Sequence, residues 1–418
     1  MSGRRLHILW IKTELLHPVD KGGRIRTYQM LRALARQHRL TYVALDDGTA
    51  APDAVARATE YCERVEVVPF TPPAKGSAAF YGALVRNLAS PLPYAVARYE
   101  VPALRERLRA LVAQGDVDVV VCDFLAPSIN VPDDLGVPVV LFQHNVEAMI
   151  WQRHAEVAGS ALKKAYMAAQ WRRMRAFEAA ECRRFDSVVA VSAQDADYFR
   201  TEYGVTRTAD VPTGVDTEFF VPADPALRRD GAMVFVGSMD WLPNEDGILW
   251  FAETMFPRIR AQVPHATLSI VGRNPTAKVQ ALHDPASGVT VTGSVPDVRP
   301  HLAAASLCIV PLRVGGGTRL KIYEGMAMAL PTVSTTIGAE GLPVVDGEHL
   351  LIGDDPAAFA DRCVTLLRDP SRAVRMGASA DAFVRANFGW DGVARRFAEL
   401  CAAALPAAHS STLTKASA

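Results

Sequence analysis

The sequence predicts an α/β protein built from two doubly wound, Rossmann-like domains, and three observations support this fold class. The chain has 418 residues, which is too long for one ordinary hydrophobic core, so two domains are expected. Short β-branched runs alternate with segments of helical periodicity through most of the sequence. Most of these runs are continuously apolar, which is typical of strands buried on both faces of a parallel sheet.

In the first half of the chain, the first strand is expected at Leu6–Ile11. A loop with two glycines then leads to a helix over Arg26–Gln37, where apolar residues recur at helical spacing. The further strands of this half are expected at Leu40–Leu45, Val65–Val68, Val117–Cys122, Val137–Phe142 and Ser187–Val191, and the further helices at Val101–Ala113 and Ala161–Phe185.

Two segments of this half have more than one interpretation. The stretch 69–99 holds five prolines and a short apolar run at 78–88, and it is either a lid or acceptor-side insertion, or a surface excursion packed on the sheet edge. The helix over Ala161–Phe185 carries seven Lys and Arg residues. It is either a basic amphipathic helix near an anionic membrane surface or a solvated outer helix packed on the sheet. Its expected apolar stripe consists of Met167, Trp171, Met174, Phe177 and Ala180.

Composition and charge exclude several functional classes. Lys and Arg together number 45, as do Asp and Glu, so the net charge gives no argument for nucleic-acid binding. No apolar run approaches the roughly 20 residues that a membrane-spanning helix needs, and the run near the N-terminus is too short for a secretory signal. The six cysteines contain no Cys-x-x-Cys pair, which indicates reduced core residues and not disulfides or a zinc site. We therefore expect a cytoplasmic protein.

The strongest functional signal is the stretch from Pro311 to Gly341, which reads PLRVGGGTRLKIYEGMAMALPTVSTTIGAEG. A buried strand is expected to end near Pro311, three glycines follow, and a helix begins with Arg319 and Lys321 near its first turn. Glycines allow backbone N–H groups to approach an anion closely, and a helix N-terminus adds partial positive charge. Cations at that end oppose the helix dipole, so stability alone does not explain them. A phosphate or diphosphate site is favoured over a flexible loop with two solvated bases.

This stretch resembles the donor-nucleotide site of the family 4 glycosyltransferases, which are retaining enzymes of the GT-B fold. The runs GGGTRLKIYEGMA and STTIGAEGL carry the resemblance, and they are similar to a subgroup that writes this segment PLRxGGGTRLKIxEAMA. The resemblance implies that Glu324 holds the ribose hydroxyls of the donor. The family usually has a second glutamate eight residues earlier, where this chain has Gly316, so the group that contacts the donor sugar is left open. The implied donor-binding residues are Gly237, Ser238, Gly316, Gly317, Thr318, Arg319, Leu320, Lys321, Glu324 and Glu340.

Two motifs of the first half extend the resemblance. The polar cluster QHNVE directly follows the run PVVLF, and ligands bind at the carboxyl ends of strands in open α/β sheets. HNVE matches the subgroup's motif, which implies that His144 contacts the donor sugar or transition state through a sugar hydroxyl. Together with Glu324, His144 is the implied catalytic residue, and Glu147 either orients a neighbour or caps the following helix. The segment PVDKGGRIRT resembles the family's N-terminal glycine loop, which implies acceptor-facing roles for Gly22, Gly23, Arg24 and Arg26.

The second half carries a linker motif and two donor-site motifs. The run VPTGVDTEFFVP resembles the linker that ends the first domain of this family, and a strand at Met233–Gly237 then opens the second domain. Most of the wider family has an arginine and a lysine for the diphosphate where this chain has Ser238 and Asn244, so the phosphates are expected to meet Arg319 and Lys321 instead. GSVPDV at 293–298 resembles the family's base-binding turn, although it also suits a simple turn before a helix. The implied nucleobase contacts are Val295 and Pro296. Further strands are expected at Ala266–Val271, Val289–Thr292, Leu307–Pro311 and Thr332–Thr336.

The expected organisation is an acceptor-side domain at 1–212 and a nucleotide-sugar-binding domain at 213–389. A helix at 390–406 is expected to cross back onto the first domain, and a disordered tail to follow at 407–418. The GT-B resemblance implies that the two domains face one another across an active-site cleft.

The expected function is transfer of a sugar from a nucleoside-diphosphate sugar, UDP- or GDP-linked, to a hydroxyl group of a carbohydrate, lipid-linked or small-molecule acceptor. The resemblance implies retention of configuration, no metal or other cofactor, and a place in polysaccharide, glycolipid or glycoconjugate biosynthesis. Peripheral contact with the inner face of a membrane is an open possibility. The alternatives are a GT-B nucleotide-sugar epimerase and a non-catalytic nucleotide-sugar-binding partner.

Overall fold

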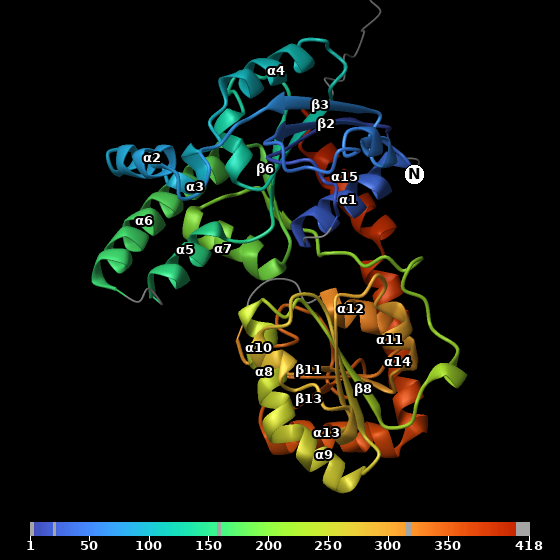
Figure 1. Ribbon diagram of the computed structural model, residues 1–418. Coiled ribbons are helices and arrows are strands. Elements are labelled where there is room, and N and C mark those ends of the chain that lie inside the picture. The colour runs from blue at the N-terminus through green and yellow to red at the C-terminus, as the bar shows by residue number, and fades with distance from the viewer. Residues whose placement is uncertain (1–3, 20–21, 157–159, 315–319, 407–418) are drawn as a thin grey trace, which may run out of the picture. The chain divides into compact units, whose positions relative to one another are not determined.

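The computed structural model describes residues 4–19, 22–156, 160–314 and 320–406. The chain divides into two compact units, which are unit 1 (residues 1–212 and 394–418) and unit 2 (residues 213–393). Each unit has its own parallel sheet with helices on both faces (Figure 1). The expected fold class, two Rossmann-like α/β domains, is confirmed.

Within its described residues, unit 1 contains a parallel sheet of seven strands in the order β3-β2-β1-β4-β5-β6-β7. The strands are β1 (His7–Lys12), β2 (Arg39–Asp46), β3 (Arg64–Pro69), β4 (Val119–Asp123), β5 (Val139–Gln143), β6 (Ser187–Ala190) and β7 (Thr208–Asp210). The helices are α1 (Gly22–Ala35), α2 (Ala78–Leu88), α3 (Tyr94–Ala97), α4 (Pro102–Val112), α5 (Glu147–Glu156), α6 (Ala161–Arg184) and α7 (Ala193–Tyr203), with 3₁₀ turns η1 (Ala56–Glu60) and η2 (Ala126–Asn130). The last helix, α15 (Trp390–Ala403), begins in unit 2 and belongs to unit 1 from Ala394 onward.

The two faces of this sheet are covered by different helices because successive side chains of a strand point to opposite sides. Leu9 and Ile11 of β1 belong to a core that includes the apolar residues of α4, α6 and α7. Trp10 points the other way, where its ring centre lies 5.4 Å from that of Phe397 in α15. Phe397 also packs at 4.9 Å from Phe142 of β5. The C-terminal helix therefore packs on the sheet of unit 1.

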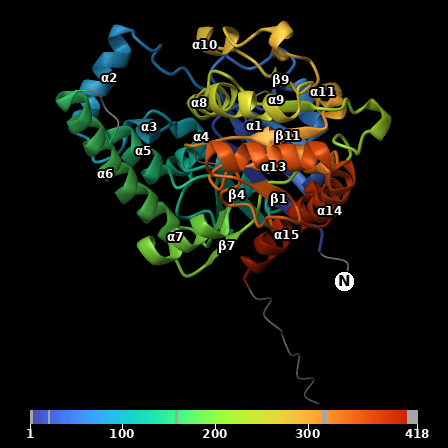
Figure 2. The ribbon, with the colours of Figure 1, turned by 90° about the horizontal axis from the view of Figure 1, so that it is seen from below.

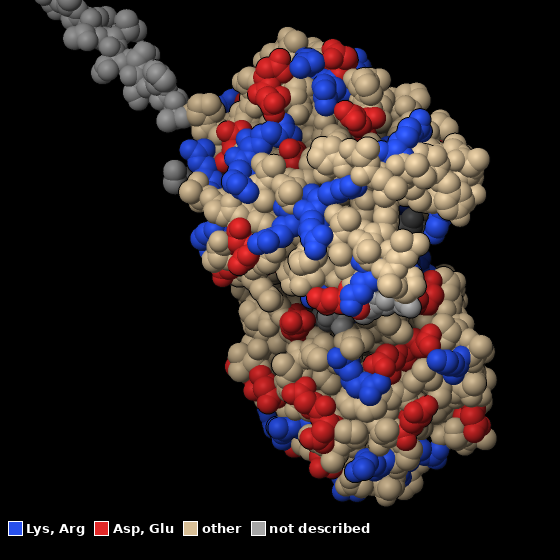
Figure 3. All heavy atoms as spheres, turned by 90° about the vertical axis from the view of Figure 1, so that its left-hand side faces the viewer, with Lys and Arg blue, Asp and Glu red and all other residues tan. Residues whose placement is uncertain are grey.

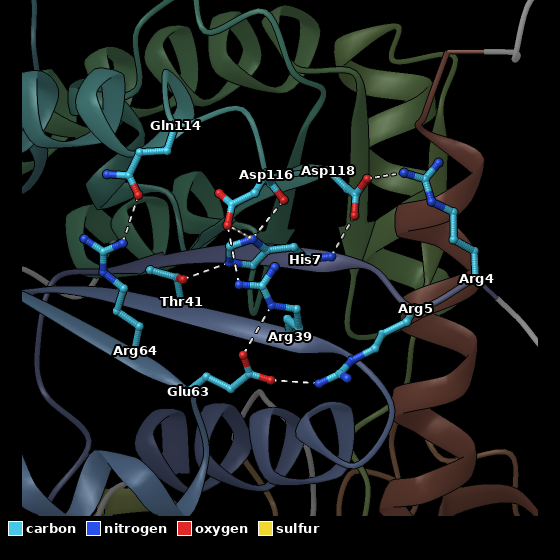
Figure 4. A network of polar contacts seen from close by, with 10 residues as sticks. All are labelled: Arg4, Arg5, His7, Arg39, Thr41, Glu63, Arg64, Gln114, Asp116 and Asp118. Carbon is cyan, nitrogen blue, oxygen red and sulfur yellow. Dashed lines mark hydrogen bonds and ion pairs between the residues drawn. The ribbon is translucent and has the colours of Figure 1, made fainter.

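A polar network covers the amino-terminal edge of this sheet (Figure 4). His7 bonds through Nδ1 to the carbonyl of Asp116 and through Nε2 to Thr41 Oγ1, each at 2.9 Å. Arg39 pairs with Glu63 at 3.3 Å and with Asp116 at 3.4 Å. Exposed pairs of this kind contribute little to stability. At this edge the ion pairs of Arg39 are solvated, whereas the bond between His7 and Thr41 is buried. The edge lies opposite the carboxyl edge at which parallel sheets bind ligands.

Within its described residues, unit 2 contains a parallel sheet of six strands in the order β10-β9-β8-β11-β12-β13. The strands are β8 (Ala232–Val236), β9 (Thr267–Val271), β10 (Val289–Gly293), β11 (Leu307–Val310), β12 (Thr332–Ser334) and β13 (Leu351–Ile352). The helices are α8 (Leu242–Trp250), the π-helical turn η4 (Phe251–Met255), α9 (Phe256–Gln262), α10 (Ala277–Gln280), α11 (Arg299–Ala304), α12 (Leu320–Ala327), α13 (Pro356–Arg368) and α14 (Pro370–Phe388), with 3₁₀ turns η3 (Pro225–Leu227) and η5 (Pro285–Ser287).

Both sheets have a topological switch point, which is where ligands bind in open α/β sheets. In unit 1 the chain starts at β1, builds outward to β3, and resumes on the other side at β4. In unit 2 it starts at β8, builds outward to β10, and resumes at β11. The switch points therefore lie between the carboxyl ends of β1 and β4, and of β8 and β11.

The strands and long helices expected from the sequence are present, and most of their ends lie within two residues of the expected ones. The first helix differs, because it begins at Gly22 and not at Arg26, so the two glycines belong to its first turn. The short strands β7 and β13 were not expected. All six cysteines are buried and unpaired, which confirms their interpretation as core residues.

The expected apolar stripe of α6 is confirmed in part, because Met174 lies in the core of unit 1 and Trp171 and Phe177 pack against it. Met174 is buried, but Met167, Trp171 and Phe177 are only partly buried, and Ala180 is exposed. The buried positions of α6 include Gln170, Glu178, Glu181 and Cys182. Polar residues are tolerated there because hydrogen bonds to α2 and α5 satisfy Gln170 and Glu178.

Candidate functional site

The candidate donor site of unit 2 centres on Lys321, in the first turn of α12. Its ammonium donates to Asn244 Oδ1 at 2.6 Å, and Asn244 Nδ2 donates to the Ser238 carbonyl at 2.8 Å. The same ammonium lies 4.3 Å from the ring centre of Phe235, a cation–π contact. These contacts hold a positive charge at the carboxyl end of β8, beside the switch point between β8 and β11.

Gly237, the residue after β8, is required by this close approach. A Cβ at this position would lie 2.9 Å from the ammonium of Lys321 and 2.7 Å from Asn244 Nδ2. Any side chain would therefore push the ammonium or the amide away. The wider family has a cation at the position of Asn244. In this chain Asn244 instead holds the ammonium of Lys321, which α12 supplies.

Glu324 follows Lys321 by three residues, so both lie on one face of α12. Burial raises the pKa of the Glu324 carboxyl to about 7, while Lys321 acts in the opposite direction. The residue as a whole remains partly exposed. A carboxyl that titrates near neutral pH beside a fixed ammonium accepts hydrogen bonds from hydroxyl groups most strongly in its charged form.

A second cation reaches this edge from β9. Arg273 is exposed, and its Nε donates to Ser238 Oγ at 2.9 Å. Ser238 Oγ in turn donates to Asp240 Oδ1 at 2.6 Å, and Asn274 Nδ2 donates to Asp240 Oδ2 at 3.0 Å. The sequence analysis expected a strand at Ala266–Val271 but assigned no role to Arg273, two residues beyond it. The available signal was a basic residue at the carboxyl end of the strand next to β8.

The other expected donor residues lie in separate segments of unit 2. Leu320 begins α12. Glu340 is exposed in the segment after β12, where its N–H donates to the Ile337 carbonyl at 3.4 Å. Val295, partly buried against the core, and Pro296, which is exposed, follow β10. The expected donor residues Gly316, Gly317, Thr318 and Arg319 lie outside the described residues.

A hollow of about 350 Å³ lies at the carboxyl ends of β11, β12 and β13. Thr336 donates through its N–H and hydroxyl to the carboxylate of Asp354 at this edge, each at 2.7 Å. The hollow is lined by Leu312, Arg313, Thr335, Thr336, Ile337 and Asp354. It therefore offers a mixed polar and apolar surface on the β11 side of the switch point.

The candidate site of unit 1 centres on Asp123, the last residue of β4, which is fully buried. Its Oδ2 accepts from Lys12 Nζ at 2.8 Å, from Thr27 Oγ1 at 2.6 Å and from Trp10 Nε1 at 3.1 Å. Its Oδ1 bonds to His144 Nε2 at 2.6 Å. Lys12 ends β1, so this ion pair closes the switch point between β1 and β4.

Electrostatics fix the protonation states of this cluster. Burial alone would raise the pKa of Asp123, but Lys12 and His144 hold it well below its ordinary value. Burial lowers the pKa of His144 to about 3, although Asp123 acts in the opposite direction. Burial also lowers the pKa of Arg26 to about 10. At neutral pH the cluster therefore contains an ionised Asp123, a neutral His144 and a charged Arg26.

Both ring nitrogens of His144 are engaged. Arg26 Nη1 lies 2.9 Å from Nδ1, and since a guanidinium only donates, Nδ1 is the acceptor and Nε2–H donates to Asp123. The ring is 3% exposed and stacks on Phe124 with centres 3.8 Å apart. In this arrangement neither nitrogen is available for the sugar hydroxyl that sequence reasoning expected it to contact.

The acceptor-facing residues expected in α1 are mostly engaged inside unit 1. Arg24 is buried and pairs with Glu14 at 2.7 Å, and Arg26 contacts His144. A Cβ at Gly23 would lie 3.1 Å from the ring of Phe124, so the helix approaches this ring closely. Gly22, by contrast, is exposed with open space around it.

The cap of α5 is supplied by Glu178 of α6 and not by Glu147. Glu178 accepts from the N–H groups of Glu147 and Ala148 at 2.8 and 3.1 Å, and from the Tyr203 hydroxyl at 2.8 Å. Burial raises the pKa of Glu178 to about 7. This carboxyl fixes the turn after His144. Sequence reasoning missed it because Glu178 lies 31 residues after Glu147, the first residue of the helix that it caps.

The described part of the chain lacks two kinds of feature. It holds no cluster of three or more His, Cys, Asp and Glu residues arranged to bind a metal ion. Its helices also include none with the length and apolar character needed to cross a membrane.

Comparisons with known proteins match both halves of the chain. Residues 21–219 match the model of a family described as Glycosyltransferase Family 4, and residues 231–369 match one described as Glycosyl transferases group 1. D-inositol 3-phosphate glycosyltransferase 1 of Catenulispora acidiphila is 30% identical over 349 residues, which cover 74% of this chain and 78% of that protein.

A second relative and a solved structure are also similar to this chain. A GDP-mannose-dependent alpha-(1-6)-phosphatidylinositol monomannoside mannosyltransferase of Mycobacterium tuberculosis is 29% identical over 239 residues, or 51% of this chain and 61% of that protein. The structure of Alr3699/HepE from Anabaena in complex with UDP superposes with a TM-score of 0.67 at 13% identity, covering 95% of this chain and all of that one.

Proposed function

Because this chain belongs to glycosyltransferase family 4 and has the GT-B fold, we propose that it transfers a sugar from a nucleoside-diphosphate sugar to a hydroxyl group with retention of configuration. The observation that carries the proposal is the fixed ammonium of Lys321 at the switch point of unit 2, with Glu324 on the same face of α12. A diphosphate needs a fixed positive charge such as the Lys321 ammonium, and the ribose needs a carboxylate such as Glu324 that accepts from its hydroxyl groups.

The donor is proposed to bind along the carboxyl edge of unit 2. Lys321, Arg273 and the N-terminus of α12 supply positive charge for the phosphates, together with the expected Arg319. Glu324 accepts from the ribose hydroxyls, and the turn with Val295 and Pro296 receives the base. We propose a UDP- or GDP-linked donor, since one relative is named as GDP-mannose-dependent and one similar structure holds UDP.

The leaving diphosphate is proposed to be stabilised by these cations and by the helix terminus, with no metal or other cofactor required. In the same-face mechanism that we propose, the acceptor hydroxyl attacks the anomeric carbon on the side from which the diphosphate leaves. The departing phosphate oxygen takes the hydroxyl proton, so no enzyme nucleophile is needed.

The acceptor is proposed to bind on unit 1, near α1 and His144. For His144 to contact the donor sugar, a sugar hydroxyl must replace one of its two partners. Arg26 is the partner that a negatively charged donor attracts, so we propose that donor binding frees His144 Nδ1. Asp123 then keeps the ring in the Nε2–H tautomer, and Nδ1 accepts a hydrogen bond from the sugar.

We propose an acceptor that is a carbohydrate, a lipid-linked sugar or a small polyol, within polysaccharide, glycolipid or glycoconjugate biosynthesis. The relatives reported above are named for an inositol phosphate and for a phosphatidylinositol mannoside. Peripheral membrane contact through the basic helix α6 belongs to this proposal. Those relatives carry the names of transferases, which gives no support to an epimerase or a non-catalytic binder.

The test is a thermal-shift panel of UDP, GDP, ADP, dTDP and CMP on the wild type, Glu324→Ala and Arg319→Ala. A ligand at a hundredfold excess over Kd stabilises the folded state by about 2.7 kcal/mol. One diphosphate that shifts the wild type but neither variant supports the donor site. Release of free sugar or transfer to an acceptor from the matching nucleotide sugar then establishes the enzyme. Absence of a shift with every nucleotide contradicts the proposal.

A further inference from the structure

Phe124, the residue directly after β4, has an unusual backbone conformation for a bulky side chain. Its φ is +72°, in the left-handed region that favours glycine. The residue lies at the switch point of unit 1, because β4 pairs there with β1, and the two strands lie side by side in Figure 2. Conformations of this kind persist only where the surrounding structure imposes them, and they gather at functional sites.

The left-handed turn brings two consecutive side chains onto one imidazole. Successive side chains of a regular strand point to opposite faces of the sheet. Here, however, Asp123 Oδ1 bonds to His144 Nε2 at 2.6 Å, and the ring of Phe124 stacks on the same imidazole. The ring centres lie 3.8 Å apart and the planes differ by 17°. Phe142 also contacts this imidazole, but its plane is tilted by 54°. Asp123 therefore holds the edge of the imidazole, and Phe124 covers its face.

The ring of Phe124 is itself held by β1 and α1. Lys12 Nζ lies 4.1 Å from its centre, which is a cation–π contact. This ammonium is 2% exposed, unlike the Lys and Arg side chains that Figure 3 shows at the surface. A Cβ at Gly23 would lie 3.1 Å from Phe124 Cζ, so the absence of a side chain there makes room for the ring.

His144 depends on this stack once Arg26 leaves it. Arg26 Nη1 lies 2.9 Å from Nδ1, and in the proposed function donor binding removes this contact. The last torsion of a histidine side chain has broad minima, and rotation about it moves Nδ1 more than Nε2. The bond from Nε2 to Asp123 therefore does not by itself fix the direction in which Nδ1 points. A parallel ring against the imidazole face opposes the rotation.

We propose that Phe124 is a positioning residue of the transfer reaction, which holds the plane of His144 so that Nδ1 points at the donor sugar. The inference rests on the sugar contact of His144 in the proposed function, and it adds a residue that the sequence analysis did not single out. Because the nucleotide is proposed to bind on unit 2, loss of the Phe124 ring should change turnover and not nucleotide binding.

The experiment measures release of UDP from UDP-glucose and of GDP from GDP-mannose by the full-length chain. Phe124→Leu keeps an apolar side chain but removes the stack, and it should lower kcat about tenfold or more with the donor KM unchanged. Phe124→Gly suits the positive φ and should show the same loss, which excludes backbone strain as its cause. Phe383→Leu is the matched control, because Phe383 of α14 stacks on His349 with ring centres 4.1 Å apart and planes at 22°. It should keep the kcat of the wild type.

A double-mutant cycle separates positioning of His144 from a purely structural role. In the His144→Asn background, Phe124→Leu should cause no further fall in kcat, because no imidazole is left to orient. Equal falls in kcat in the two backgrounds would overturn the inference.

A second measurement needs no turnover. In the chain labelled with isotope-enriched histidine, the Nε2–H of His144 should give a nuclear magnetic resonance signal, because it is buried and bonded to Asp123. His144→Asn assigns this signal. Phe124→Leu should lose it, because water reaches the uncovered imidazole, whereas Phe383→Leu should retain it. Persistence of the signal in Phe124→Leu overturns the inference. A wild type that releases neither UDP nor GDP contradicts the proposed function instead, and the signal then still decides the role of Phe124.

Discussion

Removal of the Asp123 carboxylate should be among the most destabilising single changes in unit 1. In Asp123→Ala, the ammonium of Lys12, which is 2% exposed, loses its buried counter-charge. The donors of Thr27, Trp10 and His144 lose their acceptor as well. Breaking a buried ion pair by removing one partner costs about 3–5 kcal/mol. For a domain of this size, each kcal/mol lowers Tm by about 2–4 °C, so we expect a fall of roughly 6–20 °C.

Differential scanning calorimetry of the full chain measures this effect. Asp134→Ala, which removes a carboxylate from an exposed pair with Arg109, is the control and should change Tm little. The double variant Lys12→Met, Asp123→Leu should recover part of the loss, because apolar replacement of a buried ion pair is often tolerated. A fall for Asp123→Ala no larger than that for Asp134→Ala would refute the reasoning, since it would mean that water or another cation-binding group replaces the carboxylate.

Three further predictions concern the two sites. Gly237→Ala should weaken nucleotide binding about tenfold with little change in Tm, because its Cβ displaces the Lys321 ammonium. Calorimetric titration measures the binding constant, and an unchanged Kd would refute the prediction. Nucleotide affinity should rise between pH 6 and 8, as Glu324 ionises around its pKa of about 7, and Glu324→Gln should abolish that rise. His144 has a folded pKa of about 3, below the unfolded value of 6.5, so its contribution to stability is present above pH 6.5 and is lost toward pH 3. Urea titrations should show the wild type losing up to about 1.4 kcal/mol per pH unit more than His144→Asn; equal slopes would contradict it.

The sequence was sufficient for the fold because burial on both faces of a parallel sheet leaves continuous apolar runs. Strands such as β1 and β4 are fully buried, and their runs are visible in the sequence. The segment over 161–184 was less predictable. Its polar residues Gln170 and Glu178 are buried because distant groups satisfy them, and helical periodicity carries no information about those partners.

The candidate sites were predictable where one short stretch carries the chemistry, as Lys321 and Glu324 do. The cluster around Asp123 was not predictable, because its partner Lys12 lies 111 residues away in the sequence. The two residues become neighbours only through the switch in strand order. A signal was present nonetheless. An apolar run that ends in lysine and another that ends in aspartate place opposite charges at the same edge of one sheet, on strands that pair with each other.

The role of Asn244 shows the limit of comparing motifs by residue type. Because this chain lacks the family's cation at Asn244, the sequence analysis expected Arg319 and Lys321 to meet the phosphates, and it gave Asn244 no role. The structure shows the Asn244 amide fixing the ammonium of Lys321. Two helices therefore contribute to this contact: α12 supplies the positive charge of Lys321, and α8 positions it through Asn244.

The most direct test of the donor site on unit 2 is calorimetric titration of the nucleoside diphosphate selected by the thermal-shift panel. We expect Lys321→Met to raise Kd at least about tenfold, since it removes a charge-assisted contact to phosphate. Asn244→Ala should raise Kd by a smaller factor, because it releases the ammonium without removing it. Asp123→Asn in unit 1 should leave Kd unchanged. Equal Kd values for Lys321→Met and the wild type, with binding lost in the unit 1 variant, would contradict the placement of the donor on unit 2.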